Sequence, residues 1–289
     1  MSDIAAKPLS SGWRFWRVAF APQRARASTQ AKRQGRLISS RLTPWLLPAL
    51  LLALWQGASA GGFLSSEILP SPLDVVKAGA TLVGSGQLAD NLLVSARRAA
   101  SGFLVGGALA FALGLSNGLS RLSERLTDTT VQMIRNIPNL SLIPLVILWF
   151  GIGEESKLFL TALGVFFPIY INTFHGVRTV DAQLVEMARS YGMSSRELFL
   201  RVIFPGALPS IFVGLRYALG VMWLTLIVAE TIAANSGIGY MAMQAREFML
   251  VDVVVLAILI YAALGKLADS TVRALERRAL AWHPAFHKV

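Results

Sequence analysis

The stretch Asp181–Pro209, DAQLVEMARSYGMSSRELFLRVIFPGALP, is the longest polar interval between the apolar runs of this chain, apart from its N-terminal arm. Polar residues recur along it at helical spacing until Gly192 interrupts the pattern. Because glycine costs about 1 kcal/mol in a helix relative to alanine, we expect a break there between two short helices. Ser194 or Ser195 is the expected cap of the second helix, with Glu197 in its first turn, where the helix dipole favours an acidic side chain. We interpret the stretch as a kinked helical loop that projects from the apolar segments around it.

The composition places those apolar segments in a membrane. Of 289 residues, 54% are hydrophobic and only 15% are charged, whereas a soluble domain carries about 25% charged residues. The chain has no cysteine, which excludes disulfides, thiolate metal sites and cysteine nucleophiles. We therefore expect an all-α polytopic membrane protein.

The net charge of +11 is unevenly placed, because residues 1–43 hold nine Lys or Arg against one Asp. A basic arm could bind nucleic acid, but this arm immediately precedes an apolar run. We interpret it as a cytoplasmic anchor attracted to anionic lipid, and expect no nucleic-acid partner. The expected organisation is this arm, a transmembrane domain over 44–270 with a cytoplasmic loop over 178–209, and a basic cytoplasmic tail over 271–289.

The apolar runs predict about six transmembrane helices with both chain ends in the cytoplasm. Their expected positions are about 44–64, 92–115, 131–151, 157–174, 210–233 and 253–268. Connections rich in arginine, 120–130 and 178–209, are expected inside, and 67–90 and 234–252 outside. Pro205 and Pro209 are expected to close the cytoplasmic loop before the fifth helix. Several runs lie at the short end of the roughly 20 residues that a bilayer requires.

The first apolar run could also be a signal peptide. Ala58-Ser59-Ala60 imitates a cleavage site after a short hydrophobic region. The basic region before it is much longer than that of an ordinary signal peptide, and further spans follow it. We therefore expect a retained transmembrane helix.

The chain lacks the sequence signatures of an enzyme. A Walker A loop needs G-x-x-x-x-G-K-[ST], and the nearest string, Gly79–Ser85, has no lysine in that place. His175, His283 and His287 do not cluster with carboxylates, so we expect no metal site and no cofactor. Gly114–Gly118 matches G-x-S-x-G, but an apolar helix precedes it instead of the strand that this catalytic motif requires.

The polar loop also resembles a known motif. Glu186-Met187-Ala188, followed by Gly192 and by Val202-Ile203-Phe204-Pro205, is similar to the E-A-A, three residues, G, nine residues, I-x-L-P loop of bacterial ABC importer permeases. IPNLSLIPLVILWFGIGEESK (137–157) and AETIAANSGIGYMAMQAREF (229–248) resemble the nitrate, taurine and sulfonate importer group. Within that group, LRYALGVMWLTLIVAETIAANSGIGY (215–240) and ALGKLAD (263–269) resemble the permeases for aliphatic sulfonates. The resemblance covers about 64–284 and leaves out the arm.

This resemblance implies a type I ABC importer permease in a bacterial inner membrane, with aliphatic sulfonates as substrate and taurine or nitrate as alternatives. Such permeases work in pairs, here a homodimer, with two cytoplasmic ATP-binding subunits and a periplasmic substrate-binding protein. ATP hydrolysis would then belong to the partner. The loop would dock on that partner through Glu186, Met187, Ala188, Arg189 and Gly192.

A stripe on the fifth expected helix is the candidate translocation path. Arg216, Gly220, Trp223, Ile227 and Glu230 lie on one stripe, each within about 40° of Arg216 at 3.6 residues per turn. An anion in the low-dielectric core needs positive or hydrogen-bonding groups along its route. Arg216 and Glu230 are about 21 Å apart along the axis, so they cannot neutralise each other. The alternative is that Arg216 reaches the headgroups or pairs with an acid of a neighbouring span.

Two other classes of function remain at this point. A self-sufficient secondary transporter would place ionisable residues at the bilayer midplane of inverted repeats. Arg135, Arg216, Glu230 and Lys266 are candidates, but the sequence shows no convincing repeat, and that class leaves the kinked loop unexplained. An intramembrane enzyme would need a nucleophile–base or metal constellation, which the sequence does not offer. ATP dependence of uptake and copurification of an ATPase would separate the three classes.

Overall fold

The computed structural model describes residues 43, 45–65 and 67–282, in two compact units, Met1–Phe63 and Leu64–Val289. Every regular element among these residues is a helix, which confirms the all-α prediction. In the first unit they form one apolar helix, Trp45–Ala60. The basic arm, except for Thr43, lies outside the described residues.

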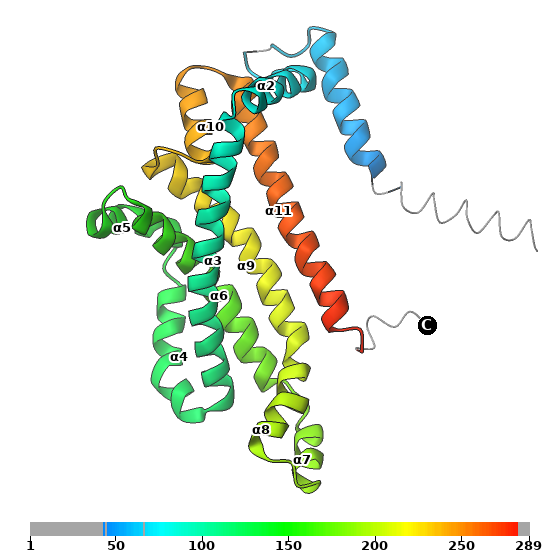
Figure 1. The fold of residues 1–289 in the computed structure, drawn as a ribbon, viewed down its shortest axis with the longest axis vertical. Helices are drawn as coiled ribbons and strands as arrows, with labels where there is room; N and C mark the ends of the chain where they lie inside the picture. The colour runs from blue at the N-terminus through cyan, green and yellow to red at the C-terminus, as the bar shows by residue number, and fades with distance from the viewer. Residues whose placement is uncertain (1–42, 44, 66, 283–289) are drawn as a thin grey trace, which may run out of the picture. The chain divides into compact units, whose positions relative to one another are not determined.

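The second unit is built from long helices that run side by side, with short helices at both ends (Figure 1). The long helices are α3 (Gln87–Leu119), α6 (Glu154–Arg178), α9 (Phe204–Ala233) and α11 (Val251–Ala279). At one end lie α2 (Pro72–Gly84) and α10 (Ile238–Glu247). At the other end lie α7 (Ala182–Ser190) and α8 (Ser195–Leu198), which a short π-helix, η2 (Phe199–Ile203), joins to α9. The remaining elements are α4 (Arg121–Arg135), a 3-10 turn η1 (Asn139–Leu142) and α5 (Ile143–Phe150).

Four helices in the described part of the chain are long and apolar enough to cross a membrane, and a bent pair makes up to five. Trp45–Ala60 is a shorter apolar helix, so the first expected span is helical but shorter than the roughly 20 residues that a bilayer requires. α11 extends well into the expected tail, to Ala279.

The third expected span is wrong as a continuous helix. α4 and the segment Asn139–Phe150 meet at an angle of 85°. Pro138 explains the bend, because it lacks an N–H and disfavours helical backbone at the residue before it. The break, residues 136–138, leaves irregular backbone beside the cavity described below.

Three expected loops contain helices. Residues 121–130 are part of α4, which Ser120 caps by accepting a hydrogen bond from the N–H of Ser123. The 67–90 region holds α2, where Ser71 is the cap and Pro72 the first residue, a combination that favours helix initiation. The 234–252 region holds α10. Short helices of this kind carry no long apolar run, so hydropathy alone misses them.

Close backbone contacts hold α6 between α3 and α9. A side chain at Gly106 or Gly114 of α3 would collide with the backbone of Ala162 or Tyr170 on α6. On the other side, a side chain at Gly214 of α9 would collide with Asn172 and the Pro168 carbonyl. Small residues allow such approaches, and in lipid this packing is a main source of helix association.

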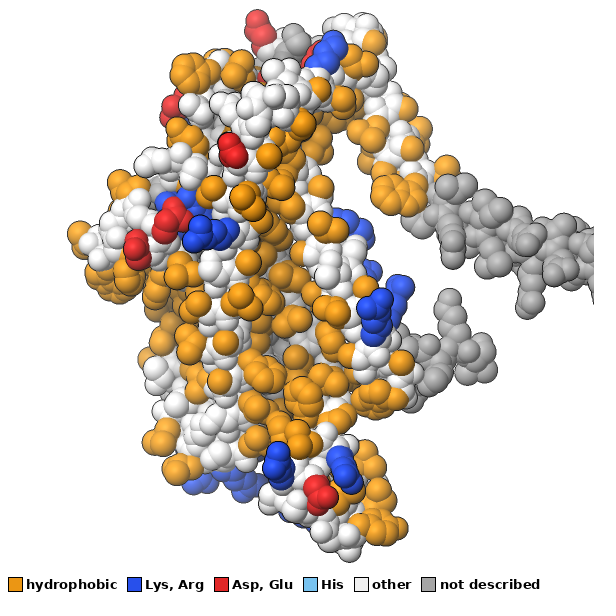
Figure 2. Space-filling view, in the orientation of Figure 1, with side chains coloured by type: hydrophobic (Ala, Val, Ile, Leu, Met, Phe, Trp, Pro, Cys, Tyr) orange, Lys and Arg blue, Asp and Glu red, His pale blue; other side chains and the backbone are white. Residues whose placement is uncertain are grey.

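The surface of this unit separates by charge along the long helices. Apolar side chains cover most of the face in Figure 2, while Lys and Arg gather at the α7–α8 end and on the lower part of α11. Acidic side chains gather toward the α2–α10 end. This pattern is typical of a helical bundle in a bilayer with one basic side.

Candidate functional site

The kinked loop has the form that its sequence predicts. α7 ends at Ser190, and Gly192 adopts a left-handed backbone with φ of +76°, which glycine tolerates without steric cost. Ser194 caps α8, because its hydroxyl accepts the N–H of Glu197 at 3.3 Å while the Glu197 carboxylate accepts the N–H of Ser194 at 3.1 Å. This reciprocal capping box fixes the direction of α8. The break at Gly192 and the cap at Ser194 are therefore confirmed.

The outer surface of the loop carries most of the predicted docking residues. Glu186, Met187, Arg189 and Gly192 are exposed, whereas Ala188 is buried and packs α7 against the rest of the unit. Tyr191, which sequence reasoning missed, is 81% exposed. A large aromatic beside the turn glycine was the available signal. The loop thus presents a mixed apolar and charged face.

The loop connects to α9 without an interruption. The N–H of Phe204 bonds to the carbonyl of Phe199, so the chain passes from α8 through one wide π turn into the long helix. Pro205 lies in the first turn of α9 and Pro209 inside it. The prediction that these prolines close the loop before the span is wrong. Pro205 has a φ that suits the first turn of a helix, and Pro209 is accommodated inside α9 at the cost of one backbone hydrogen bond.

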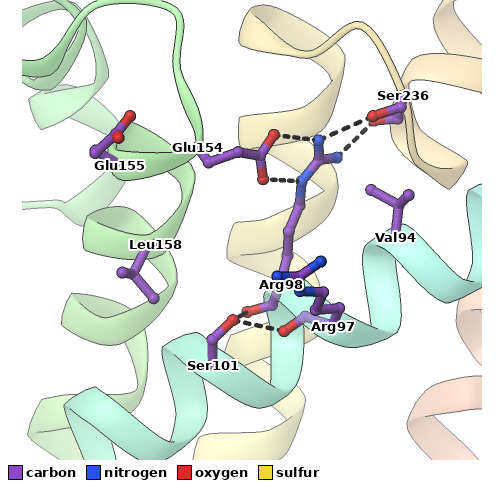
Figure 3. A pocket seen from close by; sticks show the side chains of 8 residues that line it. All are labelled: Val94, Arg97, Arg98, Ser101, Glu154, Glu155, Leu158 and Ser236. Carbon is purple, nitrogen blue, oxygen red and sulfur yellow. Dashed lines mark hydrogen bonds and ion pairs between the residues drawn. The ribbon is translucent and has the colours of Figure 1, made fainter.

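A buried ion-pair cluster lies at the opposite end of the long helices (Figure 3). Arg98 of α3 is only 6% exposed. Its guanidinium donates to Glu154 of α6 at 2.5 and 2.7 Å, to Glu230 of α9 at 2.9 Å, and to the backbone oxygen and hydroxyl of Ser236 at 2.5 and 3.0 Å. One side chain therefore joins three helices and the segment that follows α9.

Glu230 is the centre of this cluster and is 1% exposed. Besides Arg98, its carboxylate accepts from the Ser95 hydroxyl at 2.8 Å, the Tyr261 hydroxyl at 3.0 Å and the N–H of Gly239 at 2.9 Å. A buried carboxylate is tolerated only when paired and hydrogen-bonded in this way. In this conformation the Glu230 carboxylate is therefore surrounded by these protein groups and does not face an open path.

The stripe predicted on the fifth span divides between the surface and the core. Gly220 is exposed, with open space around it. Trp223 and Ile227 pack into the hydrophobic core beside Tyr261, and the indole Nε1 of Trp223 is buried without a hydrogen-bond partner among the described residues.

Arg216, near the α7–α8 end of that stripe, has acidic partners on α11. Its Nε lies 3.1 Å from Asp269 Oδ1 and its Nη1 lies 3.7 Å from Glu276 Oε2. This matches the alternative in which Arg216 pairs with an acid of a neighbouring span. A role in the translocation path stays a prediction for all the stripe residues.

A cavity of about 500 Å³ opens where α4 and α5 bend away from each other. It lies between that bend, α6 and α9. Its lining consists of Arg135, Ile137, Pro138, Asn139, Gly164, Phe167, Pro168, Ile171, Asn172, Tyr217 and Val221. Sequence reasoning singled out Arg135 as ionisable, but nothing in the sequence placed it beside α6 and α9.

The described residues contain no group of three or more His, Cys, Asp or Glu that could hold a metal ion.

Residues 102–280 match the family model for the binding-protein-dependent transport system inner membrane component. The chain belongs to this family. Members of this family are ABC permease subunits and not themselves enzymes. The family match and the apolar helices together show that this chain is a multi-pass membrane protein.

Curated relatives of this inner membrane component cover nearly the same length. The putative aliphatic sulfonates transport permease protein SsuC of Escherichia coli K12 is 63% identical over 86% of this chain and 94% of its own. A Bacillus subtilis 168 protein of the same name is 44% identical over 90% and 94%. The taurine transport system permease protein TauC of Escherichia coli K12 is 35% identical over 81% and 87%.

The part that matches the inner membrane component family includes the kinked loop, the cavity and Glu230, but begins after Arg98. The cluster around Arg98 therefore joins the matched part of the chain to the first half of α3. The loop resemblance stated from the sequence agrees with this family.

Proposed function

We propose that this chain is the transmembrane subunit of an ATP-driven importer for aliphatic sulfonates. The observation that carries the proposal is the 63% identity to the permease named for those substrates, over 86% of the chain. The kinked loop supports an importer that is driven by a separate ATPase, because such an exposed, stiffly capped loop is suited to docking.

The loop docks, in this proposal, in a groove on the ATP-binding subunit. Glu186, Met187, Arg189 and Gly192 supply the exposed surface, and Ala188 holds α7 in place from behind. Two such ATPases would serve a pair of permease copies. ATP hydrolysis takes place on these partners, and a periplasmic binding protein delivers the substrate.

A homodimer with its pathway between the copies is part of the proposal. The small residues of α3 do not support it, because Gly106 and Gly114 already contact α6 within the chain. What supports it is the exposed apolar face of α9, where Val213, Tyr217 and Leu224 are each more than half exposed. Gly220 lies on the same face, with Arg216 toward the α7–α8 end.

The orientation in this proposal places the α7–α8 end in the cytoplasm, together with both termini. The Lys and Arg side chains at that end support it, since basic residues are retained on the cytoplasmic side. The Arg98 cluster would then lie near the outer face, where the binding protein arrives.

Uptake by the assembled importer in proteoliposomes tests the proposed function. Vesicles that hold the permease and its ATPase, with the binding protein outside and ATP inside, should accumulate a labelled alkanesulfonate. Accumulation should require ATP and should exceed that of taurine, the substrate named for the 35% identical relative. Faster taurine uptake would favour that second substrate, and uptake without ATP would overturn the importer mechanism.

A further inference from the structure

The cavity at the α4–α5 bend lies at mid-depth of the long helices. Its lining residues on α6, from Gly164 to Asn172, are central in a helix that runs from Glu154 to Arg178. Tyr217 and Val221 are likewise central in α9. The cavity therefore belongs to the middle of the bilayer and not to either headgroup region.

Arg135 is the one charged side chain in this lining. It is exposed, and within the described residues it forms no ion pair. Arg98 and Arg216, in contrast, each have carboxylate partners. An arginine at the bilayer centre is costly unless it meets water or a counter-charge. The cavity must therefore supply either water or a counter-charge to Arg135.

The backbone around the cavity is also suited to polar contents. Residues 136–138 are not helical, and irregular backbone at membrane depth is tolerated where it is buried in protein or lines an aqueous cavity. Pro168 has no N–H, so the Gly164 carbonyl loses its usual helical partner at the same place. Discontinuous helices of this kind form the substrate sites of many transporters.

The remaining lining combines hydrogen-bond donors with apolar surface. Asn139 contributes an amide and Tyr217 a hydroxyl, while Phe167, Ile171 and Val221 contribute apolar surface. No Asp or Glu belongs to the lining. A guanidinium with neighbouring donors suits an oxyanion, and the apolar wall suits a short hydrocarbon chain.

We propose that this cavity is an organic-anion site at mid-membrane, in which Arg135 binds the charged head of the substrate and the Phe167–Ile171–Val221 wall contacts its aliphatic part. The proposal deepens the proposed function, because the alkanesulfonate of the importer would be the natural occupant. It assigns the anion contact to Arg135 of α4, whereas the sequence had directed attention to Arg216.

Charge-selective labelling tests the site without relying on transport. The chain has no cysteine, so Asn139→Cys in the assembled importer provides a single thiol in this subunit beside Arg135. A sulfonate-bearing methanethiosulfonate reagent is compared with a trimethylammonium-bearing one, and Ser85→Cys at the exposed end of α2 gives the intrinsic ratio of the two reagents. We expect the ratio at position 139 to favour the anionic reagent by about tenfold over that at position 85, because a charged cleft concentrates counter-ions.

The added change Arg135→Gln should abolish this preference, and an alkanesulfonate should slow labelling at position 139 in the parental background. Equal ratios at positions 139 and 85, or a preference that survives Arg135→Gln, would overturn the site. Because the first comparison keeps Arg135, it decides the matter even if the Arg135→Gln chain does not assemble.

Uptake gives the second measurement. Arg135→Gln should lower alkanesulfonate uptake at least about tenfold through loss of a charge-assisted contact, while Arg125→Gln, on the same helix but outside the cavity, should transport at the parental rate. Parental uptake by Arg135→Gln would overturn the assignment. If the parental importer does not transport sulfonates but the labelling preference is present, the proposed function fails and the anion site stands.

Discussion

Replacing Glu230 with glutamine removes the buried negative charge at the centre of the Arg98 cluster. The amide keeps the shape of the carboxylate but exchanges one acceptor oxygen for a donor NH₂ group. In the native protein four donors converge on the Glu230 carboxylate, from Arg98, Ser95, Tyr261 and Gly239. At least one of them must lose its acceptor, and the guanidinium loses one of its two counter-charges.

The expected loss of stability follows from this geometry. Removing one partner of a buried ion pair costs about 3–5 kcal/mol, because the other charge is left uncompensated. Glu154 continues to pair with Arg98, so we expect the lower part of that range, about 3 kcal/mol. For a chain of this size the corresponding decrease in Tm is on the order of 10 °C.

Thermal unfolding of the purified permease in detergent, followed by tryptophan fluorescence, measures the effect. Glu155→Gln is the matched control, since Glu155 is exposed, lies beside the Arg98 cluster and accepts no bond from Arg98. The double variant Arg98→Met/Glu230→Gln removes both charges but keeps an amide oxygen as acceptor for the Ser95, Tyr261 and Gly239 donors, and should recover much of the loss. A change below about 1 kcal/mol for Glu230→Gln would refute the reasoning, since the loss of this buried counter-charge would then cost no more than an ordinary hydrogen bond.

Three further substitutions probe other parts of the unit. Gly192→Val places a β-branched residue at φ of +76°, which costs about 1–2 kcal/mol locally. We expect the variant to insert in the membrane but to hydrolyse ATP without uptake. Normal ATP-driven uptake would argue against loop docking at this turn. Gly106→Leu should prevent the close packing of α3 on α6 and greatly reduce the yield of folded protein. The control Gly84→Leu, where a side chain meets open space, should leave that yield unchanged. Equal yields of the two variants would contradict the packing account. Gly220→Cys should react with a water-soluble thiol reagent in at least one state of the importer. The control Ala218→Cys, at a position with 0% exposure, should not react. If Gly220→Cys never reacts, that face of α9 does not line the path.

Local signals made the kinked loop predictable. The break at Gly192 and the cap at Ser194 depend on residues within a few positions of one another, and both are found in the structure. Hydropathy likewise locates the long helices, although α3 and α11 extend beyond their apolar runs. The bend after α4 had a signal in Pro138, which hydropathy averaged into one span.

The partners of the charged residues could not be predicted in the same way. Arg98 and Glu230 are 132 positions apart in the sequence, and no periodicity relates them. The sequence showed that Glu230 and Arg216 needed partners, but not which helices would supply them. Nor could it bring Arg135 together with Tyr217, because the cavity exists only once α6 and α9 are packed.

The attachment of α9 at its two ends determines how it can move. One end continues through the π turn into the kinked loop, and the other is held at Glu230 by bonds to α3, α10 and α11. A pivot at Glu230 would require α6, in close contact at Gly164 and Gly214, and α3, in close contact with α6, to move with α9, and would break the bonds from Arg216 to α11. Tyr217 lies about 20 Å from the loop end of a helix about 45 Å long, so a displacement of the loop is roughly halved where α9 borders the cavity. Glu230 is thus the expected pivot point for a movement of α9 that begins at the kinked loop.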